Sequence, residues 1–255
     1  MRYHDGSRGD FSEEFGELLT QYASEGESGD GLLASAYEPF VPSDTEQIRS
    51  TVHVIRAQAM RFMLPYKFAI SEIKTKLVIL QEEFRELGTY NPIDTVTTRL
   101  KSFESILEKI QRRHFNGTIE QLKAEITDIA GIRVTCSFIS DVYTVRDLLV
   151  SQDDVTLVQE KDYIEHPKGN GYRSLHLLLQ IPVFLSSGPE PTIAEVQIRT
   201  KAMDFWASLE HKIYYKYNSD VPQEYLDGLR EAAITANELD LKMQQLHRAI
   251  RETDA

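Results

Sequence analysis

Asp128 and Glu195 are the two carboxylates of the sequence best placed to do chemistry. Asp128 stands just before the apolar stretch "GIRVTCSF", and Glu195 lies inside "TIAEVQIRT", where apolar and polar residues alternate. Strand periodicity puts Glu195, Gln197 and Arg199 on one face of that segment. A carboxylate at a strand edge suits Mg²⁺, which takes oxygen ligands and shares them with phosphate groups. A carboxylate within reach of a hydroxyl can also act as a general base.

The stretch "GNGYRSLH" predicts a second polar face. Alternation places Tyr172, Ser174 and His176 on one side of a strand. We expect a hairpin between residues 172–184 and 192–199, which would bring this side next to the polar face of "EVQIRT". The simplest interpretation of such alternation is a solvent-exposed sheet surface. An aromatic ring, an imidazole, a carboxylate and an amide gathered on one side favour a binding site instead.

The densest positive charge lies on a predicted helix over residues 100–114. Helical periodicity gathers five polar residues on one face of it, namely Lys101, Ser105, Lys109, Arg112 and Arg113. A solvated helix face is the simplest interpretation. A hydroxyl among cations fits a polyphosphate site better, since hydroxyls donate to phosphate oxygens and lysines supply charge.

The remaining pattern predicts an α/β (α+β) fold in which helices flank a mixed β-sheet. Helices are expected over residues 47–63 and 67–87, with an interruption near Pro65, and over 118–126, 141–151, 201–216 and 222–252. Besides the hairpin, strands are expected over residues 132–138 and 154–163. These elements would hold the carboxylates, the aromatic face and the cationic helix.

Composition narrows the class of protein. The chain has 255 residues, 41% of them hydrophobic, and a formal net charge of −12. Such acidity argues against a general nucleic-acid binder, so no DNA partner is expected. No run approaches the ~20 apolar residues of a membrane span, and no signal peptide is expected. The single Cys136 excludes an internal disulfide framework, and together these features predict a cytoplasmic protein.

The chain is expected to contain three regions. Residues 1–46 form an acidic, glycine-rich and largely flexible extension that includes a short amphipathic helix over 12–23. Residues 47–220 form the main domain, and 221–255 a closing helix. The apolar stripe of that helix could pack on its own domain or form a subunit interface, and the sequence leaves both open.

Several motifs in this chain resemble the synthetase domain of the RelA/SpoT family, above all its stand-alone small alarmone synthetases. The motifs are "TRLKSFESILEK", "DIAGIRV", "KDYIEHPKGNGYRSLH", "EVQIRTKAMDFWASLEH" and "YYKY", in this order. The resemblance implies transfer of the β,γ-pyrophosphate of ATP to the ribose 3′-hydroxyl of GDP or GTP, giving ppGpp or pppGpp in the stringent response. It also implies a nucleotidyltransferase-like mixed sheet, Mg²⁺ as cofactor and a homo-oligomer, often a tetramer.

The resemblance further implies roles for individual residues. On the ATP side, Arg99 and Arg133 would sandwich adenine, and Lys101, Ser105, Lys109, Arg112 and Arg113 would hold or lie near the phosphates. On the acceptor side, Tyr172 would stack on guanine, Lys161, Lys168 and His176 would contact phosphates, and Ser174 and Gln197 would complete the site. Asp128 and Glu195 would bind Mg²⁺, and Glu195 would take the proton of the 3′-hydroxyl.

The sequence leaves several alternatives open. The segment "QEKD" before "YI" matches the family's basic type only in part, because Gln159 stands where that type has Arg, so the choice among GDP, GTP and GMP is open. A non-catalytic nucleotide- or RNA-binding regulatory module, and a nucleotidyltransferase acting on a protein or sugar, are competing interpretations. Intact Asp128, Tyr172 and Glu195 favour the synthetase. Regulation by alarmone or RNA and the role of the N-terminal extension are also open.

Overall fold

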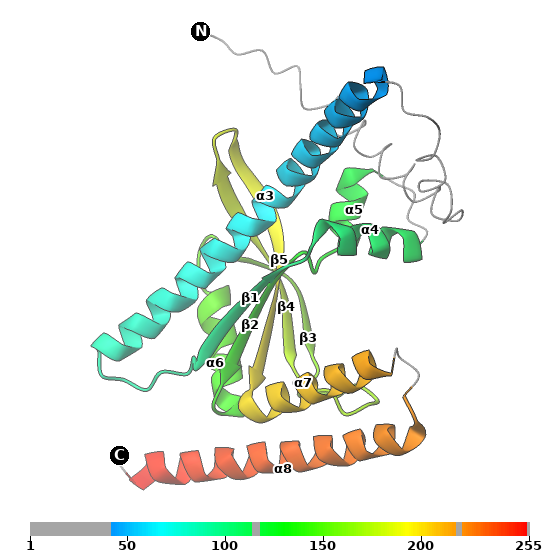
Figure 1. The fold of residues 1–255 in the computed structure, drawn as a ribbon. Coiled ribbons are helices and arrows are strands. Elements are labelled where there is room, and N and C mark those ends of the chain that lie inside the picture. The colour runs from blue at the N-terminus through cyan, green and yellow to red at the C-terminus, as the bar shows by residue number, and fades with distance from the viewer. Residues whose placement is uncertain (1–41, 114–117, 218–220, 254–255) are drawn as a thin grey trace. The chain divides into compact units, whose positions relative to one another are not determined.

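The computed structural model describes residues 42–113, 118–217 and 221–253. The helix expected over residues 12–23 lies outside these residues, as does the predicted extension up to residue 41. The elements are α3 (Pro42–Glu86), β1 (Thr95–Leu100), α4 (Phe103–Arg112), α5 (Ile119–Glu125), β2 (Ala130–Cys136), α6 (Ile139–Val150), β3 (Thr156–Asp162), β4 (Leu175–Leu185), β5 (Gly188–Thr200), α7 (Lys201–Lys216) and α8 (Gln223–Thr253) (Figure 1).

The chain divides into two compact units. The described part of the first unit comprises residues 42–67, 100–113 and 118–129, and that of the second unit comprises residues 68–99, 130–217 and 221–253. In the first unit, Ser102 caps α4 by accepting a hydrogen bond from the backbone N–H of Ser105, which satisfies a donor that the helix itself cannot pair.

The second unit is built on a five-stranded sheet with the order β1-β2-β5-β4-β3. Strand β2 runs parallel to β5, whereas β4 pairs antiparallel with both β5 and β3. The predicted mixed sheet and the predicted hairpin are therefore confirmed. Alternate residues of the hairpin, such as Leu177 and Val196, are fully buried on one face, and the opposite face carries polar side chains.

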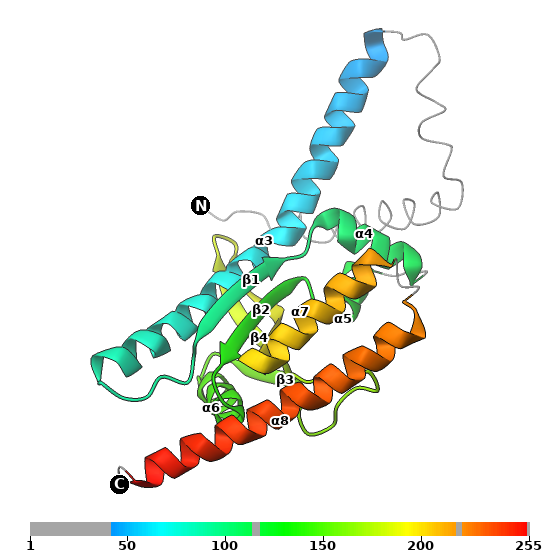
Figure 2. The ribbon, with the colours of Figure 1, turned by 60° about the horizontal axis from the view of Figure 1, so that its bottom comes forward.

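Helices α6 and α7 both contact β2 and β5, and α8 packs along α7 (Figure 2). The Trp206 indole N–H donates to the backbone oxygen of Leu229 at 2.7 Å, and both residues pack with Ala207 and Ala233 in a buried cluster. The start of the predicted stripe on α8 therefore packs on its own unit. Farther along the helix, Leu239, Met243, Leu246 and Ile250 are exposed. Among the described helices, none combines the length and apolar character that crossing a membrane requires.

The predictions for α3 and for the helix over residues 100–114 differ from the structure. Helix α3 runs through Pro65 without a break, and the buried side chains of Phe62 and Tyr66 on either side of it show that packing outweighs the loss of one backbone hydrogen bond. The helix expected over residues 100–114 is shorter, because the preceding residues form β1, which was not predicted. As a result Lys101 precedes α4 instead of lying on it.

Candidate active site

A cluster of charges in the first unit centres on Asp128, in the turn between α5 and β2. Lys101 Nζ lies 2.7 Å from Asp128 Oδ2, and Lys109 Nζ lies 2.7 Å from Oδ1. Partial burial alone would raise the pKa of Asp128, but the hydrogen bonds and positive charges of the two lysines outweigh it and hold this pKa below its usual value. Although Lys101 lies outside the helix, the structure does bring it to Lys109.

The rest of the predicted cationic face is less tightly held. Arg112 and Arg113 are both exposed, and Arg113 Nη1 donates to the backbone oxygen of Glu125 at 3.4 Å. The Ser105 hydroxyl accepts from the Ser102 hydroxyl at 3.0 Å. The first unit thus presents two lysines on one carboxylate and further hydroxyl and arginine groups along α4, a set suited to a polyphosphate.

In the second unit, four of the predicted residues form one row across the sheet. Arg133 on β2 pairs with Gln197 on β5, Gln197 pairs with His176 on β4, and His176 pairs with Lys161 on β3. Directly opposed residues point to the same face of a sheet. Four strands therefore present one line of side chains that can bind anions or bases, and the expectation that the two polar faces coincide is met.

Glu195 lies beside this row and is held at both carboxylate oxygens. His176 Nδ1 lies 3.1 Å from Glu195 Oε1, and Gln197 Nε2 donates to Oε2 at 3.0 Å. The position opposite Glu195 on β2 is Gly131, which has no side chain to cover the carboxylate. Glu195 is thus oriented by two neighbours while 20% of its side chain remains exposed, as a base that must meet a substrate requires.

Tyr172 stands before β4 rather than within it, at the end of a turn that Gly171 makes possible. Gly171 has a φ of +91°, a conformation that other residues rarely adopt. Lys168 Nζ lies 4.6 Å from the ring centroid of Tyr163 and 4.8 Å from that of Tyr172. An aromatic ring with a cation beside it can receive a base and its phosphates.

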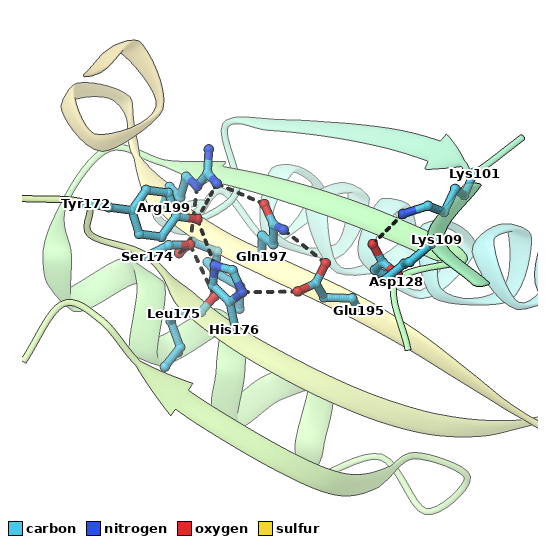
Figure 3. Close-up of polar contacts among 11 residues, drawn as sticks. Lys101, Lys109, Asp128, Tyr172, Ser174, Leu175, His176, Glu195, Gln197 and Arg199 are labelled. Atoms are coloured by element: carbon cyan, nitrogen blue, oxygen red, sulfur yellow. Dashed lines mark hydrogen bonds and ion pairs between the residues drawn. The ribbon is translucent and has the colours of Figure 1, made fainter. Parts of the chain in front are cut away.

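Arg199 is the residue whose role was not predicted. Its side chain is only 5% exposed, and its guanidinium donates to Tyr172 Oη, to Gln197 Oε1 at 2.9 Å and to Ser174 Oγ at 3.2 Å (Figure 3). It also lies 3.3 Å from Asp204 Oδ1. The alternation in "EVQIRT" had placed Arg199 on the face of Glu195, so the signal was present in the sequence.

The other predicted residues of the second unit vary in how closely they join this network. Ser174 is fully buried, and its hydroxyl donates to the backbone oxygen of Ile198 at 3.3 Å. Arg133 Nη1 lies 3.3 Å from Asp204 Oδ1. Arg99 is exposed on β1, the strand next to β2.

Within the part of the chain that the structure describes, no three His, Cys, Asp or Glu side chains form a group able to hold a metal ion by themselves. Each unit does supply one carboxylate of the kind Mg²⁺ uses, namely Asp128 and Glu195. Because Mg²⁺ is usually held by one or two carboxylates together with substrate phosphates, either carboxylate taken by itself fits the ion in the presence of a nucleotide.

A family model described as a region found in RelA/SpoT proteins matches residues 98–220. GTP pyrophosphokinase YwaC of Bacillus subtilis is 51% identical over 181 residues, which make up 71% of this chain and 86% of YwaC. The chain belongs to the RelA/SpoT family.

Solved structures of RelA/SpoT proteins agree with the fold. Small alarmone synthetase 1 of Bacillus subtilis bound to its product pppGpp has a TM-score of 0.72 and 36% identity, covering 76% of this chain and 99% of that one. The same enzyme bound to AMPCPP has a TM-score of 0.67 and 34% identity, covering 77% and 99%. The expected synthetase fold is therefore confirmed, and the competing non-catalytic interpretation finds no support among these relatives.

Proposed function

We propose that the chain is a (p)ppGpp synthetase that transfers the β,γ-pyrophosphate of ATP to the ribose 3′-hydroxyl of GDP or GTP. The observation that carries the proposal is the carboxylate of Glu195, held at both oxygens by His176 and Gln197 in a RelA/SpoT chain. A module that only binds nucleotides has no need of a carboxylate oriented in this way.

We assign ATP binding to the residues that the resemblance implies. Lys101, Ser105 and Lys109 would bind the phosphates, with Arg112 and Arg113 adding charge near them. Asp128 holds the two lysines at 2.7 Å, which keeps their ammonium groups in place for an incoming polyphosphate. Arg99 and Arg133 would bind adenine, since a planar guanidinium stacks on aromatic rings.

The guanine nucleotide would occupy the second unit. Tyr172 would stack on guanine, Lys168 would meet the phosphates from its position beside the ring, and Lys161 and His176 would bind phosphate from their places in the row. Gln197 would orient the acceptor. Because the Ser174 hydroxyl is buried against protein atoms, we propose that Ser174 acts by holding Arg199.

The reaction forms a bond between the 3′-oxygen of the acceptor and the β-phosphorus of ATP. The bond between that phosphorus and the oxygen bridging to the α-phosphorus breaks, and AMP leaves with the electron pair. The proton of the 3′-hydroxyl passes to Glu195. Lysines and arginines stabilise the charge that spreads over the phosphate oxygens.

Asp128 and Glu195 would hold Mg²⁺, which when bound neutralises charge on the phosphates. The nucleotide substrates favour a cytoplasmic location. The division into an extension over residues 1–46, a synthetase domain over 47–220 and a C-terminal helix over 221–255 stays a prediction.

We further propose that the exposed apolar side chains of α8 support a homo-oligomer, with a tetramer as the expected form. Leu246 is 56% exposed and Ile250 61% exposed, and apolar side chains in such a stripe are commonly covered by a partner. Light scattering of the purified chain measures the number of copies, and a monomer at every concentration would reject this part of the proposal.

A labelling experiment tests the enzymatic function. The purified chain is incubated with Mg²⁺, γ-labelled ATP and one of GDP, GTP or GMP, and the nucleotides are separated. We expect label in a product of each accepted guanine nucleotide, together with an equal amount of AMP. Label released only as inorganic phosphate, or no transfer to any acceptor, would refute the synthetase.

A further inference from the structure

Arg199 sits at the origin of two hydrogen-bond branches that both end on Glu195. One branch passes from the guanidinium to Tyr172 Oη and from there to His176, 2.8 Å away at Nε2. The other passes to Gln197 Oε1 at 2.9 Å. His176 and Gln197 are the two residues that hold the oxygens of Glu195. The buried guanidinium of Arg199 therefore contacts the first residue of each of the two hydrogen-bond branches that lead to the oxygens of Glu195 (Figure 3).

The chemistry of Arg199 sets the direction of the first branch. A guanidinium has only donors and stays protonated in proteins, so Tyr172 Oη must be the acceptor. The single phenolic proton is then free to point at His176 Nε2, which accepts it. In the neutral imidazole the ring proton must consequently lie on Nδ1, the atom that faces Glu195 Oε1 at 3.1 Å.

Arg199 also sets the donor and acceptor roles in the second branch. Because Arg199 donates to Gln197 Oε1, the amide oxygen is turned toward the guanidinium. The NH₂ group is thereby turned toward Glu195 Oε2, to which it donates at 3.0 Å. Without Arg199 the amide loses the donor that fixes its oxygen, and only the contact with Glu195 then sets its orientation.

We propose that Arg199 is a positioning residue that orients both donors of Glu195 and thereby aims the base at the acceptor hydroxyl. The inference rests on the proposed function of Glu195. Arg199 itself need not touch either nucleotide, because its side chain is almost fully buried. Asp204, 3.3 Å from Nη1, supplies the countercharge that a buried guanidinium needs.

Two substitutions test this role. Arg199→Lys keeps the charge but cannot donate in two directions from a planar fork. Tyr172→Phe keeps the ring for stacking and cuts only the branch through His176. For Arg199→Lys we expect kcat to fall about 10²-fold, the cost of a misplaced catalytic group, with KM for ATP unchanged. For Tyr172→Phe we expect a fall of about tenfold, the effect of one hydrogen bond.

The double variant Arg199→Lys with Tyr172→Phe distinguishes a loss of positioning of Glu195 from a general disruption of the structure. If Arg199 acts partly through Tyr172, the double variant loses less than the product of the two single losses. Ser174→Ala, which removes another contact of Arg199, is the matched control and should lower kcat least. Unchanged kcat in Arg199→Lys, or full multiplication of the two losses, would overturn the proposal.

The ring proton of His176 gives a readout that does not depend on turnover. Nitrogen-detected NMR of the histidine-labelled chain should show the proton on Nδ1 in the wild type, and a changed tautomer balance in Tyr172→Phe. A proton on Nε2 in the wild type would overturn the proposal. If the wild type transfers no pyrophosphate, the function fails, while the same spectrum of Arg199→Lys still decides whether Arg199 sets the hydrogen-bond directions, because an unchanged tautomer balance there would overturn the proposal. If Arg199→Lys does not fold, Tyr172→Phe supplies both readouts.

Discussion

Replacing Gly171 by alanine tests how the turn before Tyr172 is built. Gly171 has a φ of +91°, and a Cβ added there would lie 2.5 Å from the Cβ of Ala233 on α8. Real Cβ atoms do not approach so closely, so either the turn or the helix must move. Because Tyr172 is the next residue, the same movement displaces the proposed guanine platform.

Two costs determine the magnitude for Gly171→Ala. Holding a non-glycine residue at such a φ costs about 1–3 kcal/mol, and overpacking against a well-packed neighbour costs about 1–3 kcal/mol. We therefore expect a loss of about 2–6 kcal/mol in the free energy of unfolding of the second unit. Domains are stable by only about 5–15 kcal/mol, so the effect should be large.

Denaturant unfolding followed by tryptophan fluorescence measures this loss at the right place. The chain has a single tryptophan, and Trp206 packs in the same buried cluster as Ala233. Gly169→Ala is the matched control, because a Cβ at Gly169 meets nothing within 4 Å, and its stability should change by less than about 1 kcal/mol.

Adding Ala233→Gly to Gly171→Ala should relieve the contact but not the backbone cost, so the pair should couple favourably. Equal stability of Gly171→Ala and the wild type would refute the strained turn. If the stability changes of Gly171→Ala and Ala233→Gly simply add in the double variant, the close contact with α8 is refuted.

Three further predictions follow from single side chains. Burial raises the pKa of the Cys136 thiol far above its usual value, so a thiol reagent should leave the native chain unmodified and react after unfolding; rapid reaction of the native chain would contradict the buried strand. The pKa of Asp128 is lowered in the folded chain, so its stabilising contribution is present above about pH 3.9, the usual value, and is lost as pH falls through the lower folded pKa. Asp128→Asn should remove this part of the acid dependence of the free energy of unfolding. The same acid dependence in Asp128→Asn and the wild type would reject this contribution. Tyr172→Ala should raise KM for the guanine nucleotide by about tenfold or more, the loss of one base stack, while KM for ATP stays the same; an unchanged guanine KM would remove the stacking role.

The sequence was sufficient to predict the paired polar faces. In a strand the side chains alternate strictly, so His176, Glu195 and Gln197 could be placed on their faces before the pairing was known. The pairing of β4 with β5 then set His176 opposite Gln197. The position of Lys101 was harder to predict, because the short exposed strand β1 has little apolar alternation and the helical pattern of α4 extends into it.

The role of Arg199 could not be predicted from periodicity alone. Alternation showed the side on which it lies, but its four partners come from three different segments of the chain. Tyr172 and Ser174 stand before β4, Gln197 lies on β5, and Asp204 lies on α7. Such a convergence depends on tertiary structure. The uninterrupted course of α3 through Pro65 has the same origin, since burial of its neighbours overrides local propensity.

Glu195→Gln shows whether Glu195 is the base of a pyrophosphoryl transfer. Glutamine has nearly the same shape but does not accept the proton of the 3′-hydroxyl. Transfer from γ-labelled ATP to GDP is timed for both chains, and ATP binding is measured separately. We predict that the variant binds ATP as the wild type does and loses about 10²–10⁴-fold in the rate of product formation, the typical contribution of a general base. A variant that makes labelled product within about threefold of the wild-type rate would show that Glu195 is not the base.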